Sequence, residues 1–213
     1  MNEILIEKAL ASVKKLFEGN SDGHDFFHTE RVYKTALKLA KTENAGLEIT
    51  ALAAILHDAD DRKLSPETCE NKLNAGNILT ELGIDSERQT AILKIISEVS
   101  FVGTDSPVPE TKEGKCVQDA DRLDAMGAIG IARAFAFGGS RGRQMYNPDI
   151  KPTLNADSRT YAKIENSTSV NHFYEKLFLL KDMMNTEAAK RIAKEREQFM
   201  KEFLEEFYKE WNG

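Results

Sequence analysis

Apolar residues recur every three or four positions along most of this chain, which is the spacing of one face of an α-helix. In the first such segment the apolar positions include Ile6 and Phe17, and Gly19 follows as a stop signal. Further along, Ser86 and Gln89 predict a capping box at a helix start. No stretch alternates apolar and polar residues as a half-buried strand does. The pattern predicts an all-α fold, with helices over about residues 2–18, 25–43, 47–57, 73–82, 86–99, from 115 onward, and 171–211.

One long stretch breaks this pattern. Between Phe137 and Ser169 the chain is poor in apolar periodicity and rich in glycine and arginine. Loops this long inside a compact domain are usually functional or disordered. We therefore expect a single domain over residues 1–213, with a motif-bearing core at about 20–137, a loop at 138–170, and C-terminal helices at 171–211 that pack on the bundle.

The segment from Leu52 to Lys63 concentrates the polar chemistry. Its apolar side chains share one helical face that ends at His57, and three carboxylates follow at positions 58, 60 and 61. A carboxylate beside a buried face is costly unless a cation or hydrogen bonds compensate it. A metal ion held by His57 and Asp58 would supply that compensation.

Two further residues complete the set of candidate ligands. His28 continues the buried stripe of the second helix, and Asp121 shares an apolar face with Asp124 farther along the chain. Asp119 points away from that face, so Asp121 is the better ligand and Asp124 suits a supporting role. A histidine such as His28, taken alone, is more often a core residue than a ligand. Its occurrence with the other candidates favours the ligand.

The ordered set of His28, then His57 and Asp58, then Asp121, each on a helix, resembles the HD-domain metal-dependent phosphohydrolases. The resemblance covers about residues 23–137, and the sequence after it resembles a branch of small bacterial HD hydrolases. It implies an HD-type helical bundle in which these four residues are the metal ligands.

The number of histidines limits the number of metal ions. Two imidazoles and two carboxylates form a mixed nitrogen and oxygen set, unlike the thiolate-rich set of many zinc sites. Such a set suits Mn²⁺, Mg²⁺, Fe²⁺, Co²⁺ or Ni²⁺, and we favour Mn²⁺. Binuclear members of the superfamily recruit further histidines between the His-Asp pair and the final aspartate, where this chain has none. We therefore expect one divalent ion, which would activate water and neutralise phosphoryl charge.

A proton-transfer group and phosphate contacts are expected beside the metal. Asp61 stands three residues after Asp58, where several HD-type nucleotide hydrolases carry an acidic residue, so the resemblance implies that Asp58 and Asp61 are catalytic. Asp60 is the alternative to Asp61. The cationic residues expected to contact phosphates are Arg31, Arg62, Lys63 and Arg122, with Arg141 and Arg143 in the loop. For Arg31 and the loop pair, a solvated surface position is an equal alternative.

Composition and charge narrow the class of partners. A formal net charge of −6 argues against a nucleic-acid backbone as the main partner. The chain has no apolar run of membrane-spanning length, and charges interrupt its start too early for a signal peptide. Cys69 and Cys116 form neither a metal-binding spacing nor a disulfide framework, which favours a reducing compartment. We expect a cytoplasmic protein.

The resemblance implies hydrolysis of a small phosphorylated compound, with a nucleotide favoured, and in particular a phosphoanhydride of a nucleoside triphosphate. Hydrolysis of a cyclic nucleotide or an alarmone is an alternative. So is a non-catalytic HD module that binds a nucleotide and signals to a partner. Aromatic residues at helical spacing near the C-terminus favour core packing or a subunit interface, so a homodimer is also considered.

Overall fold

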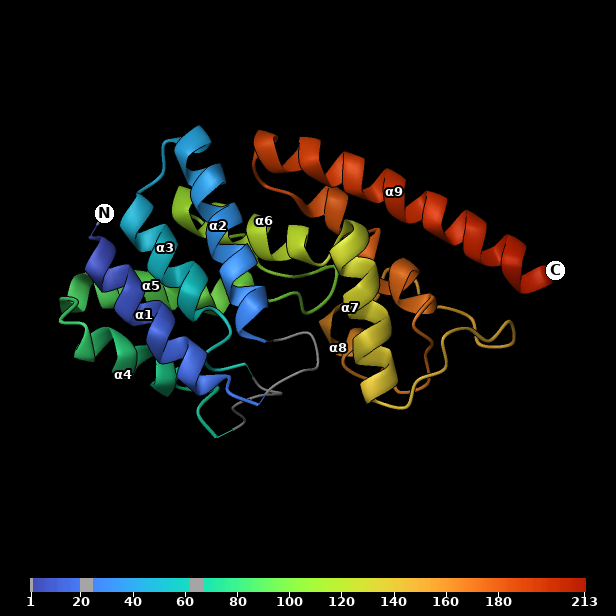
Figure 1. Ribbon diagram of the computed structural model, residues 1–213, viewed down its shortest axis with the longest axis horizontal. Helices are drawn as coiled ribbons and strands as arrows, with labels where there is room; N and C mark the ends of the chain where they lie inside the picture. Colours follow the sequence, from blue (N-terminus) through green and yellow to red (C-terminus); the bar gives the residue numbers. More distant parts are fainter. Residues whose placement is uncertain (1, 20–24, 62–66) are drawn as a thin grey trace. The chain divides into compact units, whose positions relative to one another are not determined.

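The regular elements of this protein are helices (Figure 1). The computed structural model describes residues 2–19, 25–61 and 67–213. No strand occurs within these ranges, so the all-α prediction is confirmed. Among the same residues, no helix is both long and apolar enough to span a bilayer.

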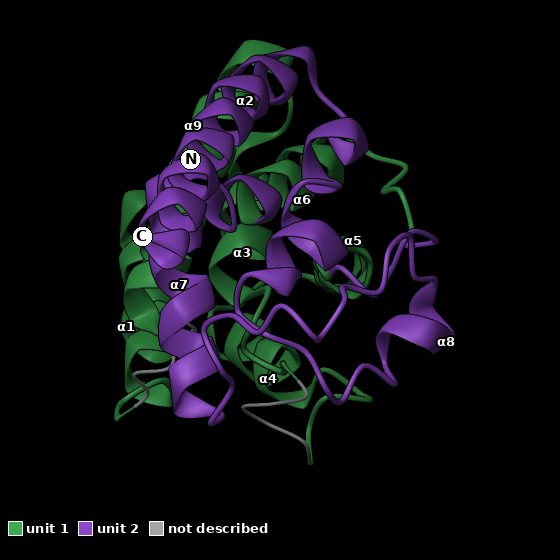
Figure 2. Ribbon diagram, turned by 90° about the vertical axis from the view of Figure 1, so that its right-hand side faces the viewer, with its two compact units in different colours: residues 1–100, 107–121 green, residues 101–106, 122–213 purple. Residues whose placement is uncertain are grey.

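The chain divides into two compact units, which Figure 2 shows in different colours. Unit 1 comprises residues 1–100 and 107–121, and unit 2 comprises residues 101–106 and 122–213. The helices of unit 1 are α1 (Glu3–Leu16), α2 (Phe26–Glu43), α3 (Leu47–Leu56), α4 (Leu73–Glu81), α5 (Ser86–Val99) and the greater part of α6 (Lys112–Asp124). The elements of unit 2 are α7 (Gly127–Ser140), α8 (Ser158–Tyr161), the π-helical turn η1 (Phe173–Leu177), the 3₁₀ turn η2 (Leu180–Met183) and α9 (Glu187–Asn212).

Helix α3 forms the core of unit 1 because it is apolar on nearly every side. All its residues from Thr50 to Leu56 are buried, and α1, α2 and α5 pack against it. A helix without a polar face is stable only when neighbouring elements cover it on all sides. The last turn of this covered helix leads directly into His57.

Aspartates begin two of the helices in unit 1. Asp25 precedes α2, and its carboxylate accepts the backbone N–H of His28 at 2.9 Å. Asp85 precedes α5 and accepts the N–H of Arg88 at 3.0 Å. The predicted capping box at Ser86 is therefore wrong by one residue, because Ser86 is already the first helical residue and Asp85 takes the capping position.

Helices α7 and α9 pack against each other in unit 2, where the ring centroids of Phe135 and Phe203 lie 5.9 Å apart. The sequence predicts helices over residues 171–211, and the structure has there the π-helix η1, the 3₁₀ helix η2 and then α9. The apolar stripe at the start of this segment is buried, as the sequence predicts. The buried members of the stripe are Phe173, Leu177, Leu180 and Met184.

The loop after α7 begins later than the sequence suggests. Helix α7 continues to Ser140, so Gly138 and Gly139 lie in its last turn. The returning chain passes so close that a Cβ atom at Gly138 would lie 2.1 Å from the Oγ of Ser169. Close packing explains this glycine without a bound phosphate.

Candidate metal centre

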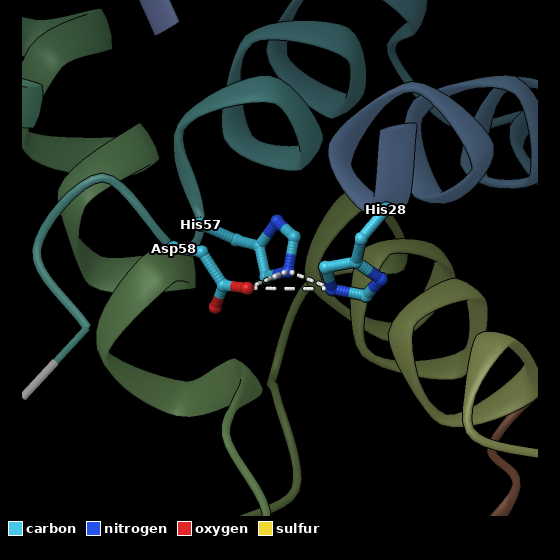
Figure 3. A group of neighbouring side chains, drawn as sticks. All are labelled: His28, His57 and Asp58. Carbon is cyan, nitrogen blue, oxygen red and sulfur yellow. Dashed lines mark hydrogen bonds and ion pairs between the residues drawn. The ribbon is translucent and has the colours of Figure 1, made fainter. Parts of the chain in front are cut away.

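Two histidines far apart in the sequence point their Nε2 atoms at each other (Figure 3). His28 lies in the first turn of α2, and His57 directly follows α3. The Nδ1–H of His57 donates to the carbonyl oxygen of Ala54 at 2.8 Å. Because a carbonyl can only accept, this contact fixes the tautomer and presents the Nε2 lone pair to the site. The two Nε2 atoms are 3.3 Å apart.

Two carboxylates face the same pair of nitrogens. The Oδ2 of Asp58 lies 3.3 Å from Nε2 of His28 and 3.4 Å from Nε2 of His57. The Oδ1 of Asp121, on α6, lies 3.5 Å and 3.7 Å from these two atoms. The fold therefore brings together the four side chains that the sequence selects as ligands, and all four belong to unit 1.

Burial and mutual attraction set the charges of this cluster. His28 is 1% exposed and His57 is 4% exposed. Burial opposes a charged imidazole, but the carboxylates of Asp58 and Asp121 outweigh it and raise the pKa of His57. Burial also opposes ionised carboxylates, but the histidines hold the pKa of Asp58 well below its usual value and lower the pKa of Asp121 to about 2. Both carboxylates are thus anionic at neutral pH, and the centre of the cluster favours positive charge.

The donor chemistry of the cluster fits a divalent metal ion. Among the described residues, His28, His57 and Asp58 offer ligand atoms that all lie within 4.8 Å of one another, and Asp121 adds a further oxygen. Ligands about 2.1 Å from one ion lie roughly 3.0–3.4 Å from each other at octahedral or tetrahedral angles. The observed donor separations of 3.3 to 3.5 Å among the shortest contacts are close to that range. These two nitrogens and two oxygens are the mixed donor set that the sequence predicts.

The two aspartates considered for proton transfer have different surroundings. Asp60 is 1% exposed, and its carboxylate accepts the backbone N–H groups of Asn74 and Ala75 at 3.0 and 2.9 Å. Asp61 is half-buried, and its backbone N–H donates to the carbonyl of Asp58 at 3.0 Å. Both oxygens of Asp60 accept backbone hydrogen bonds, and proton transfer by Asp61 stays a prediction.

Arg122 has surroundings that differ from those expected for a phosphate contact. Its side chain is 2% exposed, and its guanidinium donates to the carbonyl oxygen of Met183 in unit 2. A buried guanidinium needs such acceptors to offset the loss of hydration. This contact gives Arg122 a part in packing, and its phosphate contact stays a prediction.

The other cationic residues predicted to contact phosphate differ in how far their side chains are exposed. Arg31 is half-buried on α2. Arg141 is exposed, with its guanidinium carbon 5.3 Å from the centre of a phenylalanine ring. Arg143 is half-buried, and its backbone N–H donates to the carbonyl of residue 138 at 2.8 Å. Arg62 and Lys63 lie outside the described residues. Contact of these residues with phosphate stays a prediction.

Sequence reasoning misses two residues whose side chains form hydrogen bonds with the backbone near the cluster. It gives Asp25 no role, whereas the carboxylate of this residue caps α2 by accepting the backbone N–H of His28. It passes over Asn74, whose side-chain amide donates to the carbonyl of Ala59 at 2.9 Å. The signal for Asp25 is present in the sequence, since an aspartate directly before a helical stripe is a typical cap. Asn74 gives no such signal, because its partner lies 15 residues away.

Comparison with known proteins places these residues in a family. The family model described as HD domain matches residues 25–126, which contain all four clustered side chains. YpgQ of Bacillus subtilis is 38% identical over 206 residues, which cover 94% of this chain and 91% of YpgQ. The crystal structure of Bacillus subtilis YpgQ in complex with ADP has a TM-score of 0.75 and 36% identity, and the match covers 96% of this chain and 97% of that one.

Two other crystal structures match almost the whole chain. An HD-superfamily hydrolase from Bacillus thuringiensis is 42% identical with a TM-score of 0.76, and the match covers 99% of this chain and 98% of that one. A protein from Lactobacillus plantarum is 38% identical with a TM-score of 0.88, and the match covers 100% and 99% of the two chains. Sequence and fold agree beyond the residues that the domain model matches, and on both grounds this chain belongs to the HD-domain superfamily.

Proposed function

We propose that this protein is a divalent-metal-dependent phosphohydrolase whose substrate is a nucleotide, with cleavage of a phosphoanhydride in a nucleoside triphosphate favoured. The observation that carries the proposal is the convergence of His28, His57, Asp58 and Asp121, whose facing atoms lie 3.3 to 3.7 Å apart. The ADP complex of YpgQ supports a nucleotide as the ligand.

In this proposal the four clustered side chains hold one ion, for which Mn²⁺ is favoured. Such an ion supplies Lewis acidity that activates water and offsets charge on phosphoryl oxygens. Asp61 accepts the proton that the attacking water loses. The cationic residues assigned to the substrate phosphates are Arg31, Arg62, Lys63, Arg122, Arg141 and Arg143.

The compartment follows from the same proposal. Cys69 and Cys116 are not joined in a disulfide. Cysteines that do not form disulfides are typical of reducing surroundings. We therefore propose that the protein acts in the cytoplasm.

A hydrolysis screen tests the proposed function. Metal-stripped protein receives each of Mn²⁺, Mg²⁺, Co²⁺, Ni²⁺ and Fe²⁺ and is assayed against nucleoside triphosphates, diphosphates, cyclic nucleotides and simple phosphate esters. We expect metal-dependent hydrolysis that is strongest with a nucleoside triphosphate and is abolished by Asp58→Asn. The matched control is Asp85→Asn, which alters a helix-capping acid away from the cluster.

Two outcomes would contradict the proposal. Hydrolysis that survives Asp58→Asn unchanged would place the chemistry elsewhere. Nucleotide binding without hydrolysis under any metal would instead favour the non-catalytic HD module that signals to a partner.

A further inference from the structure

Asp60, two residues beyond Asp58, is hydrogen-bonded to α4, a helix that contributes no side chain to the metal centre. The carboxylate of Asp60 accepts the N–H of Asn74 at 3.0 Å and the N–H of Ala75 at 2.9 Å, and both donors lie in the first turn of α4. Lys72, which precedes α4, has a φ of 51° and makes no side-chain cap hydrogen bond. Asp60 therefore supplies the cap that α4 lacks locally, and the two N–H groups stabilise its buried charge.

The side chain of Asn74 in turn donates hydrogen bonds to the segment that carries Asp60 and to Thr68. Its side-chain amide donates to the carbonyl of Ala59 at 2.9 Å and to the Oγ1 of Thr68 at 3.0 Å. Residues 59–60 and residues 74–75 are therefore joined by three hydrogen bonds, which we call the Asp60–Asn74 clamp. A partly buried network of this kind holds the chain in one arrangement when its polar groups are satisfied.

The clamp fixes the far end of the turn that carries Asp58. At the near end, the turn continues from α3, and the N–H of Ala59 donates to the carbonyl of Leu56 at 3.0 Å. Within the turn, the N–H of Asp61 donates to the carbonyl of Asp58 at 3.0 Å. Asp58 thus lies in the chain between the covered helix α3 on one side and the clamp on the other.

We propose that the Asp60–Asn74 clamp positions the carboxylate of Asp58 for metal binding, so that Asp60 is a positioning residue rather than a proton-transfer group. This inference rests on the metal centre of the proposed function but not on its substrate. Hydrogen-bonded groups that orient a ligand typically change metal affinity by about 10–100-fold when removed. A cap with no connection to the metal centre would change stability alone.

Titration with Co²⁺ tests this inference through the visible absorption of the bound ion. Wild-type and Asp60→Ala chains are titrated at a temperature well below both melting transitions. We expect Asp60→Ala to raise the Kd for Co²⁺ by about 10–100-fold and to change the spectrum, because the Asp58 oxygen leaves its place. Asp60→Asn keeps one acceptor and should lose less affinity.

Two other variants separate positioning from stability. Asp85→Ala removes a capping acid from α5 in the same unit, through its contact with the N–H of Arg88. It should lower Tm while the Kd and the spectrum of bound Co²⁺ stay those of the wild type. Asn74→Ala removes only the amide of the clamp and keeps the backbone N–H, so it gives the test even where Asp60→Ala does not fold. We expect Asn74→Ala to raise the Kd by several-fold.

Unchanged Co²⁺ affinity and spectrum in folded clamp variants would overturn the inference, and so would an equal loss of affinity in Asp85→Ala. A wild-type chain that binds no Co²⁺ would overturn both this inference and the proposed function. Weakened Co²⁺ binding in the clamp variants, with no nucleotide hydrolysis by the wild type, would support the clamp and overturn only the proposed substrate.

Discussion

At the scale of single residues, one hydrogen bond decides which nitrogen of His57 faces the cluster. The bond to Ala54 occupies Nδ1, so Nε2 is presented to His28 and the carboxylates. The residue types of the site could be predicted, because a histidine and an aspartate beside an apolar stripe need a compensating group. The ring orientation could not, since in the sequence Ala54 is one more apolar residue of the helix.

Replacing His57 should empty the metal centre. His57→Ala removes one of two nitrogen donors, so we expect metal content after dialysis to fall from one equivalent to nearly none, with hydrolysis lost as well. Elemental analysis of the dialysed protein measures this change. His172→Ala, a histidine outside the cluster in unit 2, is the control and should retain one equivalent. Two equivalents in the wild type would contradict the single ion.

Asp61→Asn should separate chemistry from metal binding. Asparagine keeps the shape of the side chain but cannot accept the proton, so kcat should fall by about a hundredfold or more. Metal content and KM should stay near the wild-type values, as steady-state kinetics and elemental analysis would show. If kcat is unchanged, Asp61 has no part in proton transfer.

Burial should keep the thiol of Cys116 inert. Burial, with a smaller contribution from Asp119, raises the pKa of Cys116 to about 12, whereas an unfolded thiol ionises near pH ~8.5. Between these two pH values the thiol stays protonated in the folded state and is ionised in the unfolded state. The free energy of unfolding therefore falls as pH rises through this range. At pH 8, iodoacetamide should label only the half-buried Cys69 in native protein and both thiols in denaturant, as mass spectrometry would count. Rapid native labelling of Cys116 would contradict its burial.

At the scale of helices and turns, apolar spacing predicts where helices occur better than where they begin. Thr186, a typical capping residue, caps α9 by accepting the N–H of Ala189 at 3.2 Å. Helix α6 begins at Lys112 rather than at the expected Lys115, because its first turn carries little apolar signal. The cap of α4 comes from Asp60, and no local pattern could reveal a contact between residues 14 positions apart.

Two glycines of α7 should respond oppositely to alanine. A Cβ atom at Gly130 would lie 2.2 Å from the carbonyl oxygen of Ala125, whereas a Cβ at Gly139 would meet nothing within 4 Å. Gly130→Ala should therefore destabilise the protein by about 1–3 kcal/mol through overpacking. Gly139→Ala should be neutral or stabilise it by up to about 1 kcal/mol, because alanine favours the helix. Denaturant unfolding measures both, and equal effects would contradict the packing around Gly130.

At the scale of the whole molecule, the division into two units places the full cluster in one of them. His28, His57, Asp58 and Asp121 all belong to unit 1. The candidate site could be predicted from this half of the chain, whereas the predicted phosphate contacts Arg122, Arg141 and Arg143 belong to unit 2. Periodicity gives no hint of the division, because both units are helical and of ordinary composition.

Metal binding should raise the thermal stability of the chain. An ion present at about a hundred times its Kd stabilises the folded state by roughly 2.7 kcal/mol, which corresponds to a Tm increase of about 5–10 °C for a chain of this size. Differential scanning calorimetry with Mn²⁺ and then with excess chelator measures the shift. Asp58→Asn should show no such shift, and an equal shift in that variant would indicate a second metal site.

Helix α3 is covered on all sides from Thr50 onward, and the chain that leaves it carries His57 and Asp58. A mutation in this helix therefore alters the core and the metal centre together, so few substitutions there can be neutral. Substitutions that change substrate choice and leave the metal centre intact are therefore expected outside this helix. In a library of variants, retention of metal would then report directly on the integrity of the core.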